Sequence, residues 1–586
     1  MKNEITRKQF LAHAGAAAAA LLTLPRPSLA ARPTTGKYCD TPSRCISPMA
    51  THGMVTSPNY LATEAGLEVL KRGGNAVDAA IAVSTTLSVV YPLWTSFGAS
   101  NFWTIYNAKT KELRGLDGNG PAGEQATIEF FKNKGMSKIP ERGYLSAITV
   151  PGAVAGWSTA HEYADKNMEG GLPWRDLFNA AFNYAQNGFP VTPSLEKWEG
   201  IVTETADRDL RDLQRFDGFR KTFLRPDGST YKVGDVLKLP ELANTIKQVA
   251  EGGADAFYKG EIAKKIVADL HANGGLLTSD DFANTKARWV KPIGVNYRGY
   301  QAVNLPPPTQ GIHSLEILNI LNNFDVRSLG EGTAGYYHLL VEAIKQSLAD
   351  RGKYVSDPDF VKIPVPELVS VQHGKDQAAH INMDSSAKDV QALAQKAGTV
   401  WFGAVDKYGN AVSAIQSVYY PFGSGIVPEG TGVLLLNRGH AFSLDPNSVN
   451  RLEPHKYTFT TLNPPMLLKD GKPYLVYGSM GGDGQPQTQA MIVTRIVDFG
   501  MSPQDAINAP RFLYGPTEGI RSNALKIEGR VPTSITDQLN KLGHTVERQP
   551  DFTDMMGHAG AILIDPENGM MYGATDPRSD GLAAGY

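Results

Sequence analysis

Apolar residues recur at helical spacing through much of the first two thirds of the chain. Two such runs lie within residues 57–90 and are divided at Gly73-Gly74; we expect Ser57 to cap the first, and the second runs from Asn75 to Leu87. Further helices are predicted at 174–187, 240–252, 260–272, 311–323 and 334–352, and strand-like alternation appears at 101–117 and 299–304. This part is therefore predicted to be mostly helical.

The pattern changes after residue 399, where short alternating strands are joined by tight turns. Strands are predicted at 399–405 and 411–417 and within the segments 466–479 and 559–575, with helices at 487–499, 503–508 and 533–542. We therefore expect the last third to bring most of the sheet. The fold class predicted is α/β, a layered body whose sheet core is assembled across position 399.

The junction between the two parts has two interpretations. A polar run at 388–397 with helical character stops at Gly398, and Thr399 opens the first strand of a hairpin. Glycine often ends a helix and threonine favours strands, so the pair can be purely structural. The alternative is that Thr399 has a chemical role, which local residues alone do not decide.

Composition narrows the class of protein. A chain of 586 residues is too long for one simple core, so two domains or one large layered body are expected. The 57 lysines and arginines are balanced by 59 acidic residues, and there is no basic block, which argues against nucleic acid as a partner.

The N-terminus has the pattern of an export signal over residues 1–30. A charged start is followed by an apolar run from Ala14 to Leu24 and by the small-x-small site Ser28-Leu29-Ala30. Thr6 to Leu11 resembles a twin-arginine signal in which Lys8 replaces the second arginine. We expect a periplasmic or secreted protein with no membrane span. A retained amphipathic helix is the weaker alternative, because the run has no polar stripe.

Cysteine and histidine give no sign of a metal centre. Cys39 and Cys45, the only cysteines, either form one small disulfide or remain free thiols. No zinc-ligand spacing occurs, and we expect no metal and no organic cofactor.

Two glycine-rich segments are candidates for chemistry. Gly118 to Gly123 fits G-x-G-x-x-G, but Pro121 removes an N–H that a dinucleotide would need. Gly478 to Gly484 lies between a predicted strand and a predicted helix, so it is either an anion-binding turn or a tight connection. The serine nucleophile pattern G-x-S-x-G is absent.

Six ordered blocks resemble the landmarks of the gamma-glutamyltransferase family over residues 48–586. They are "GMVTSPNYLATEAGLEVLKRGGNAVDAA", "PPPTQGIHSLEILNIL", "EAIKQSLADRGKYVSDPDF", "TVWFGAVDKYGNAVSAI", "GSMGGDGQPQ" with "INAPRF", and "TDPRSDGLAAGY". The resemblance implies the four-layer αββα sandwich of N-terminal nucleophile hydrolases. It also implies a precursor that cuts itself between Gly398 and Thr399, leaving a large subunit, 31–398, paired with a small catalytic subunit, 399–586.

The same resemblance implies the catalytic residues. Thr399 would be the nucleophile, and its free α-amino group, with a reference pKa of about 8, would accept the hydroxyl proton. Ser417 matches a threonine that hydrogen-bonds the nucleophile, and Gly481 and Gly482 match the oxyanion pair. Thr460 and Thr461 match two serines that contact the substrate carboxylate; strand filling is the alternative for each threonine.

The recognition residues depart from the family pattern. Asn119 stands where an arginine grips the α-carboxylate of the glutamyl group, and Ala441 where an aspartate holds its amine. A neighbouring glutamine becomes Arg438, and an asparagine becomes Tyr419. We hypothesise that Arg438 supplies the missing positive charge and that the acyl group carries a carboxylate but no tightly bound amine. The alternative is that Arg438 faces solvent or pairs with a structural carboxylate.

Three functions remain open at this point. The favoured one is hydrolysis of gamma-glutamyl or related amides such as glutathione, or transfer of the acyl group to an amine. The second is an acylase or amidase acting on glutaryl-type or other small carboxylated amides, with little action on glutathione. The third is a binding protein that has lost catalysis.

Overall fold

The computed structural model describes residues 38, 46–197, 212–389, 398–516 and 522–586. The predicted export signal, Cys39, Cys45 and residues 390–397 of the predicted run before Gly398 lie outside them. None of the helices in the described part of the chain combines the length and apolar character that a bilayer crossing needs.

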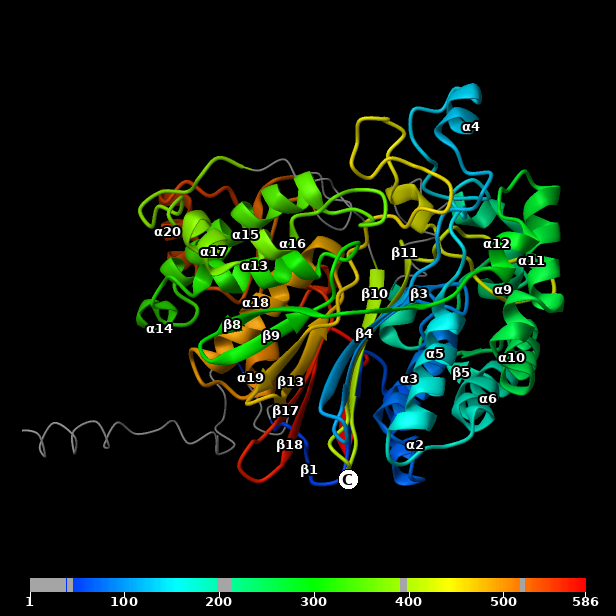
Figure 1. The fold of residues 1–586 in the computed structure, drawn as a ribbon, viewed down its shortest axis with the longest axis horizontal. Helices are drawn as coiled ribbons and strands as arrows, with labels where there is room; N and C mark the ends of the chain where they lie inside the picture. Colours follow the sequence, from blue (N-terminus) through cyan, green and yellow to red (C-terminus); the bar gives the residue numbers. More distant parts are fainter. Residues whose placement is uncertain (1–37, 39–45, 198–211, 390–397, 517–521) are drawn as a thin grey trace, which may run out of the picture.

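Two seven-stranded sheets lie face to face at the centre of the molecule (Figure 1). Neighbouring strands in both sheets run antiparallel. The first sheet has the order β1 (Met49–Ala50), β18 (Met571–Thr575), β17 (Ala559–Ile564), β13 (Lys472–Ser479), β12 (Met466–Lys469), β9 (Tyr300–Asn304), β8 (Ile293–Tyr297). The second has the order β19 (Leu582–Gly585), β2 (Met54–Ser57), β10 (Gly398–Val405), β11 (Ala411–Tyr419), β3 (Ser100–Asn107), β4 (Glu112–Gly118), β7 (Arg288–Val290).

The prediction that the last third brings most of the sheet overstates its share of the two central sheets, to which both parts of the chain contribute equal numbers of strands. Seven of these strands, β1 to β4 and β7 to β9, come from before residue 398, and the other seven come from residue 398 onward. Strands covered on both faces lose the alternation of polar and apolar residues that marks a strand. Met54–Ser57, all four of its residues buried, is an example.

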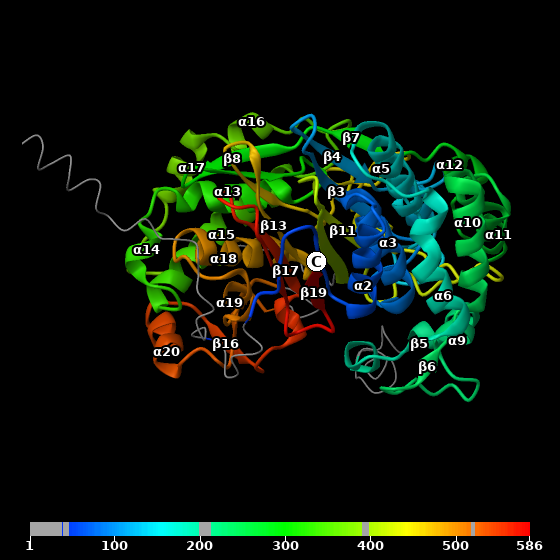
Figure 2. The ribbon, with the colours of Figure 1, turned by 90° about the horizontal axis from the view of Figure 1, so that it is seen from below.

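Helices cover the outer face of each sheet and complete four layers (Figures 1 and 2). The second sheet is covered by α2 (Tyr60–Lys71), α3 (Ala76–Val90), α5 (Ala153–Asn167), α6 (Asn179–Asn187), α10 (Pro240–Tyr258) and α11 (Glu261–Ala272). The first is covered by α13 (Gly311–Leu321), α15 (Ala334–Tyr354), α17 (Val371–Ala378), α18 (Gln485–Val497), α19 (Pro503–Asn508) and α20 (Thr533–Lys541). The predicted αββα sandwich is confirmed.

Short elements connect the layers. They are α4 (Ile128–Asn133), α9 (Asp217–Phe223), α12 (Ser279–Ala283), α14 (Val326–Leu329), α16 (Val365–Leu368), η2 (Trp174–Phe178), η3 (Asp212–Arg215), η4 (Arg438–Ala441), η5 (Gly482–Gly484), η6 (Asp554–Met556), the small sheet β14 (Phe512–Tyr514), β15 (Leu525–Glu528), β16 (Val546–Gln549), and the pair β5 (Phe189–Pro190), β6 (Val236–Leu237).

The structure corrects one predicted helix cap. Asn59, and not Ser57, caps α2: its side chain accepts a hydrogen bond from the Leu61 N–H at 3.0 Å, because Ser57 still belongs to β2.

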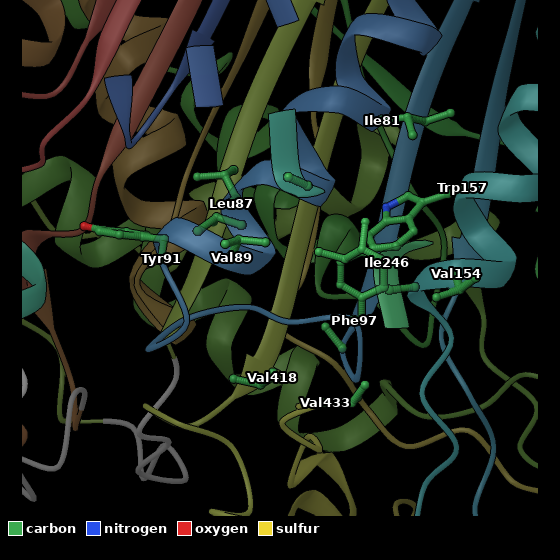
Figure 3. Close-up of a cluster of buried hydrophobic side chains, with 14 of the residues drawn as sticks. Ile81, Leu87, Val89, Tyr91, Phe97, Val154, Trp157, Ile246, Val418 and Val433 are labelled. Atoms are coloured by element: carbon green, nitrogen blue, oxygen red, sulfur yellow. The ribbon is translucent and has the colours of Figure 1, made fainter. Parts of the chain in front are cut away.

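Separate apolar cores hold the four layers together. Phe102, Trp401 and Met466 belong to the core between the two sheets. A larger core lies between the second sheet and its helices and reaches the end of β11. Figure 3 shows part of it, with Ile81, Leu87, Val89, Tyr91, Phe97, Val154, Trp157, Ile246, Val418 and Val433 labelled. Because Val418 is packed there, its neighbour Ser417 is held on a rigid strand.

Candidate active site

Thr399 lies at a bulge in the central hairpin. Gly398 pairs with Tyr419 and Val400 with Gln416, so the register shifts and Thr399 lies opposite two residues of β11, Ser417 and Val418. Thr399 is 1% exposed, and its hydroxyl has no hydrogen-bond partner among the described residues. A buried hydroxyl without a partner is costly, which favours a chemical role over simple strand filling.

The carbonyl group of Gly398, immediately before Thr399, is polarised by Ser417. The Ser417 hydroxyl donates a hydrogen bond to the Gly398 oxygen. The same hydroxyl oxygen accepts a hydrogen bond from the Tyr419 N–H at 2.7 Å, and this fixes its orientation. The peptide bond between Gly398 and Thr399 thus has an activated carbonyl on one side and an unbonded hydroxyl on the other.

Trp94 restricts the residue at position 398 to glycine. A Cβ atom built on Gly398 would lie 1.4 Å from Cε3 of the Trp94 ring. Trp94 is itself fully buried, so it has no room to move aside. Sequence reasoning did not identify this contact.

The predicted oxyanion pair lies in a left-handed turn. Gly481 and Gly482 have φ angles of 117° and 51°, a backbone that glycine adopts without strain. The turn follows β13 and leads through η5 into α18, so it combines successive backbone N–H groups with the start of a helix. Such an arrangement suits a developing negative charge.

A buried clamp that sequence reasoning missed holds this turn. The Gln310 side-chain amide donates to the carbonyl oxygens of Thr461 and Gly482, at 2.8 Å each. Arg351 donates to the Gln310 side-chain oxygen at 3.3 Å and forms an ion pair with Asp483. The clamp consists of Gln310, Arg351 and Asp483, which lie in the sequence segments "PPPTQG", "ADRGKY" and "GGDG". Their position in these family-like blocks is the signal from which the sequence could have identified them.

Arg438 is fully buried, and no carboxylate pairs with it in the parts of the chain that the structure describes. One guanidinium nitrogen, Nη1, donates to the Thr460 hydroxyl at 2.7 Å, whereas Nε and Nη2 have no partner among the described residues. The guanidinium carbon lies 5.1 Å from the centre of the Tyr419 ring. Burial lowers the pKa of Arg438 to about 10. The alternative that Arg438 faces solvent is excluded, and within the described residues no ion pair joins it to a carboxylate.

Two further unpaired polar groups belong to the predicted recognition set. Asn119 accepts a hydrogen bond from the Ser100 hydroxyl at 2.8 Å, and Ser100 is the cross-strand partner of Ser417. The Asn119 side-chain amide nitrogen has no partner in the described part of the chain, and neither does the buried Thr461 hydroxyl. With Arg438, the unpaired groups are hydrogen-bond donors or a hydroxyl, so the set suits an anion.

The residues that would hold an amine offer no carboxylate. Ala441 packs against the stacked rings of Tyr419 and Tyr420. The neighbouring Asp117 is occupied: it accepts from Arg288 at 2.6 Å and from the Asn119 N–H at 2.9 Å. An ammonium group would therefore find an apolar wall where the family has an aspartate.

Contacts connect most predicted site residues. Thr399 adjoins Gly398, whose oxygen contacts Ser417; Tyr419 contacts Ser417 and Arg438. Arg438 contacts Thr460, and Gln310 links Thr461 to Gly482. Asn119 joins indirectly, through Ser100. The candidate site is thus one connected structure built from both sides of residue 399.

Comparisons with known proteins agree with this geometry. The family model described as gamma-glutamyltranspeptidase matches residues 62–586. The glutathione hydrolase-like YwrD proenzyme of Bacillus subtilis is 41% identical over 540 residues, covering 92% of this chain and 99% of that protein. The oxamate amidohydrolase proenzyme of Klebsiella pneumoniae is 40% identical over 541 residues, with coverage of 92% and 99%.

A solved structure has the same overall architecture. The cephalosporin acylase from Bacillus halodurans superposes with a TM-score of 0.83 at 36% identity, covering 92% of this chain and 97% of that one. Family model, sequence relatives and structure all span nearly the whole described chain. The chain is therefore a hydrolase that belongs to the gamma-glutamyltranspeptidase family.

Proposed function

We propose that this protein cuts itself between Gly398 and Thr399 and then hydrolyses amides through an ester on Thr399. The observation that supports this is the unbonded, buried Thr399 hydroxyl beside a Gly398 carbonyl that accepts a hydrogen bond from Ser417. The names of two relatives include the word proenzyme, which agrees with a precursor that is processed. The product would be a large and a small subunit that stay paired across both sheets.

Self-cleavage would proceed by an acyl shift. The Thr399 oxygen attacks the Gly398 carbonyl carbon, the C–N bond to Thr399 breaks, and the nitrogen takes up a proton to become the free α-amino group. Ser417 stabilises negative charge on the carbonyl oxygen as it develops. Water then hydrolyses the ester, which leaves a carboxylate on Gly398 and restores the Thr399 hydroxyl.

The mature site would repeat this chemistry on an external amide. The α-amino group of Thr399 accepts the hydroxyl proton as the oxygen attacks the substrate carbonyl. The N–H groups of the Gly481–Gly482 turn hold the oxyanion, the amine leaves with the proton, and an acyl ester remains on Thr399. Water releases the acid; an acceptor amine in place of water would give transfer.

The pocket favours an acyl group that carries a carboxylate and lacks an ammonium group. Arg438 has two N–H-bearing nitrogens without a partner among the described residues, whereas Ala441 supplies no carboxylate for an amine. A relative named for oxamate, a small carboxylated amide, agrees with this choice. This observation favours the second candidate, an acylase or amidase for small carboxylated amides, over a glutathione hydrolase.

Intact-mass analysis tests the proposed cleavage. Wild-type protein should give two fragments, the smaller beginning at Thr399, and Thr399→Ala should stay uncut. Thr399→Ser should still be cut, because it keeps the hydroxyl, and Thr104→Ala is a matched control for a buried threonine on the same sheet. An uncut wild-type chain after prolonged incubation would refute the mechanism.

A pair of anilides tests the acyl preference. Glutaryl anilide and gamma-glutamyl anilide differ only by the α-amino group, so the ratio of their kcat/KM values isolates recognition of the amine. We expect the glutaryl substrate to be preferred. Preference for the gamma-glutamyl substrate would favour the glutathione hydrolase, and cleavage of Gly398–Thr399 without turnover of either would favour the binding protein.

A further inference from the structure

Three helices outside the candidate active site bring metal-ligating side chains together. Glu316 lies on α13, Asp350 on α15 and His373 on α17, and these helices are neighbours on the outer face of the first sheet (Figure 1). One ligand atom from each residue lies within 4.8 Å of the others. Asp350 and His373 have side chains that are 15% and 21% exposed, so the cluster is open to solvent on one side.

Glu316 is the member of this cluster whose carboxyl group is buried without a partner among the described residues. It is 2% exposed, and neither of its carboxyl oxygens has a hydrogen-bond partner among the described residues. An unpaired carboxyl in such a place is unfavourable unless a ligand supplies positive charge.

No protein cation fills this role in the described residues. Asp350 has His373 as its ion-pair partner, and Glu316 has none. Lys353, one turn further along α15, lies over the ring of Tyr354 at 4.6 Å. The carboxyl groups of Glu316 and Asp350 therefore lie close together, and within the described residues the His373 imidazole is the one ion-pair partner that they have.

The remaining contacts have the spacing of a ligand set. The His373 Nε2 atom lies 2.8 Å from Asp350 Oδ2, and the Gln377 amide lies 3.0 Å from the same oxygen. His373 and Gln377 are four residues apart on α17 and so occupy one face of that helix. Rotating the Gln377 amide by half a turn would present its oxygen in place of its nitrogen.

A second cluster in the chain shows what a satisfied network looks like. His338, Glu342 and His544 are also close enough for a metal. There, however, the two histidines are hydrogen-bonded to each other at 2.7 Å, and Lys345 pairs with Glu342 at 3.0 Å. That cluster already contains its cation and needs no ligand, in contrast to Glu316.

We propose that Glu316, Asp350 and His373, with Gln377 as a fourth ligand, bind one divalent transition-metal cation such as Zn²⁺. Carboxylate oxygens with an imidazole nitrogen are a donor set that Zn²⁺ accepts. The ion would tie together α13, α15 and α17. Because Gln310 directly precedes α13 and Arg351 follows Asp350, it would also brace the clamp on the Gly481–Gly482 turn.

Metal retention tests the site. Protein without a histidine tag is stripped with EDTA, incubated with Zn²⁺ alone, desalted, and analysed for metal by mass spectrometry. We expect wild type to retain one Zn²⁺ per chain and both Glu316→Gln and His373→Ala to lose it. His380→Ala, an exposed histidine just beyond α17, is the matched control and should retain the ion.

A thermal-unfolding measurement supplies a second readout. Bound Zn²⁺ should raise the Tm of wild type and of His380→Ala, and should leave both ligand variants unchanged. Because His373 is partly exposed, its variant tests the site even where Glu316→Gln folds poorly. Absence of retained Zn²⁺ from wild type, or retention by either ligand variant, would overturn the proposal.

Discussion

Two regions of this molecule bury arginine in opposite ways. Near the C-terminus, Arg578 forms ion pairs with Glu528 at 2.7 Å and with Asp576 at 3.0 Å, and Arg511 also pairs with Asp576. In the candidate active site, Arg438 is equally buried, and within the described part of the chain its contacts are the Thr460 hydroxyl and the Tyr419 ring.

This difference distinguishes buried charges that stabilise the fold from a buried charge that is available to bind a ligand. A buried ion pair recovers much of its desolvation cost, and removing one partner leaves an uncompensated charge. An unpaired buried cation destabilises the folded protein, because its desolvation cost is not recovered. It acquires a partner of opposite charge only when an anion binds. The C-terminal network should therefore govern stability, and Arg438 should govern affinity.

Breaking the C-terminal network should give the largest effect. Asp576→Asn keeps the side-chain size but leaves Arg511 and Arg578 short of negative charge. We expect the free energy of unfolding to fall by about 3 to 5 kcal/mol. Urea unfolding of wild type and variant measures it, and a loss below about 1 kcal/mol would remove the distinction between the two regions.

Arg438→Gln should have the reverse effects of Asp576→Asn: little change in stability and a large change in catalysis. Because the cation has no carboxylate partner among the residues that the structure describes, we expect stability to be unchanged or higher. Removing a charged hydrogen bond to the substrate costs about 1.5 to 3 kcal/mol, so kcat/KM for glutaryl anilide should fall roughly 10- to 150-fold. An anilide whose acyl group has no carboxylate should lose nothing.

Two results would contradict this interpretation of Arg438. A large loss of stability in Arg438→Gln would place the residue with the structural arginines. An equal fall in kcat/KM for carboxylated and uncharged anilides would show that Arg438 does not read the carboxylate.

The dependence of the unfolding free energy on pH in the acid range gives a second test of the C-terminal network. Burial alone would raise the pKa of Asp576, but Arg511 and Arg578 outweigh it and lower that pKa to about 2. A carboxyl with a lowered pKa in the folded state contributes stability above its ordinary value of 3.8, and that contribution is lost as the pH falls from about 4 to about 2.

The measurement is the gap in unfolding free energy between wild type and Asp576→Asn. We expect the gap to shrink by about 2 kcal/mol over that acid range, because wild-type Asp576 becomes protonated and resembles the variant. A constant gap would mean that the carboxylate charge is not what stabilises the network.

The sequence was sufficient for elements with strong local signals. The hairpin at Thr399 was predicted because the turn between two strand-forming runs is a local signal, and the fold because six blocks kept their order. Strands such as Met54–Ser57 were missed because burial on both faces erases alternation. The Trp94 contact with Gly398 and the Gln310 clamp join residues far apart in the chain, and no periodicity reports such contacts.

Arg351 lies between the two classes, and loosening the Gln310 clamp that it supports should give the smallest effect. It is buried and paired with Asp483, like the C-terminal arginines, yet through Gln310 it supports the Gly481–Gly482 turn. Gln310→Met removes two hydrogen bonds to backbone carbonyl oxygens, each worth about 1 kcal/mol, and loosens the turn. Removing an oxyanion donor outright costs more than displacing it, so we expect kcat to fall only about 5- to 10-fold, with KM unchanged.

The matched control is Gln504→Met, a buried glutamine whose amide bonds to Thr575 and Asn508 away from the site. Both variants should lose similar stability, because each loses two donated hydrogen bonds and one accepted hydrogen bond, but only Gln310→Met should lower kcat. If the two variants lowered kcat equally, or if Gln310→Met changed KM instead, the clamp would be a structural element like the C-terminal network. A fall in kcat confined to Gln310→Met would show that the clamp serves catalysis by fixing the position of the Gly481–Gly482 turn.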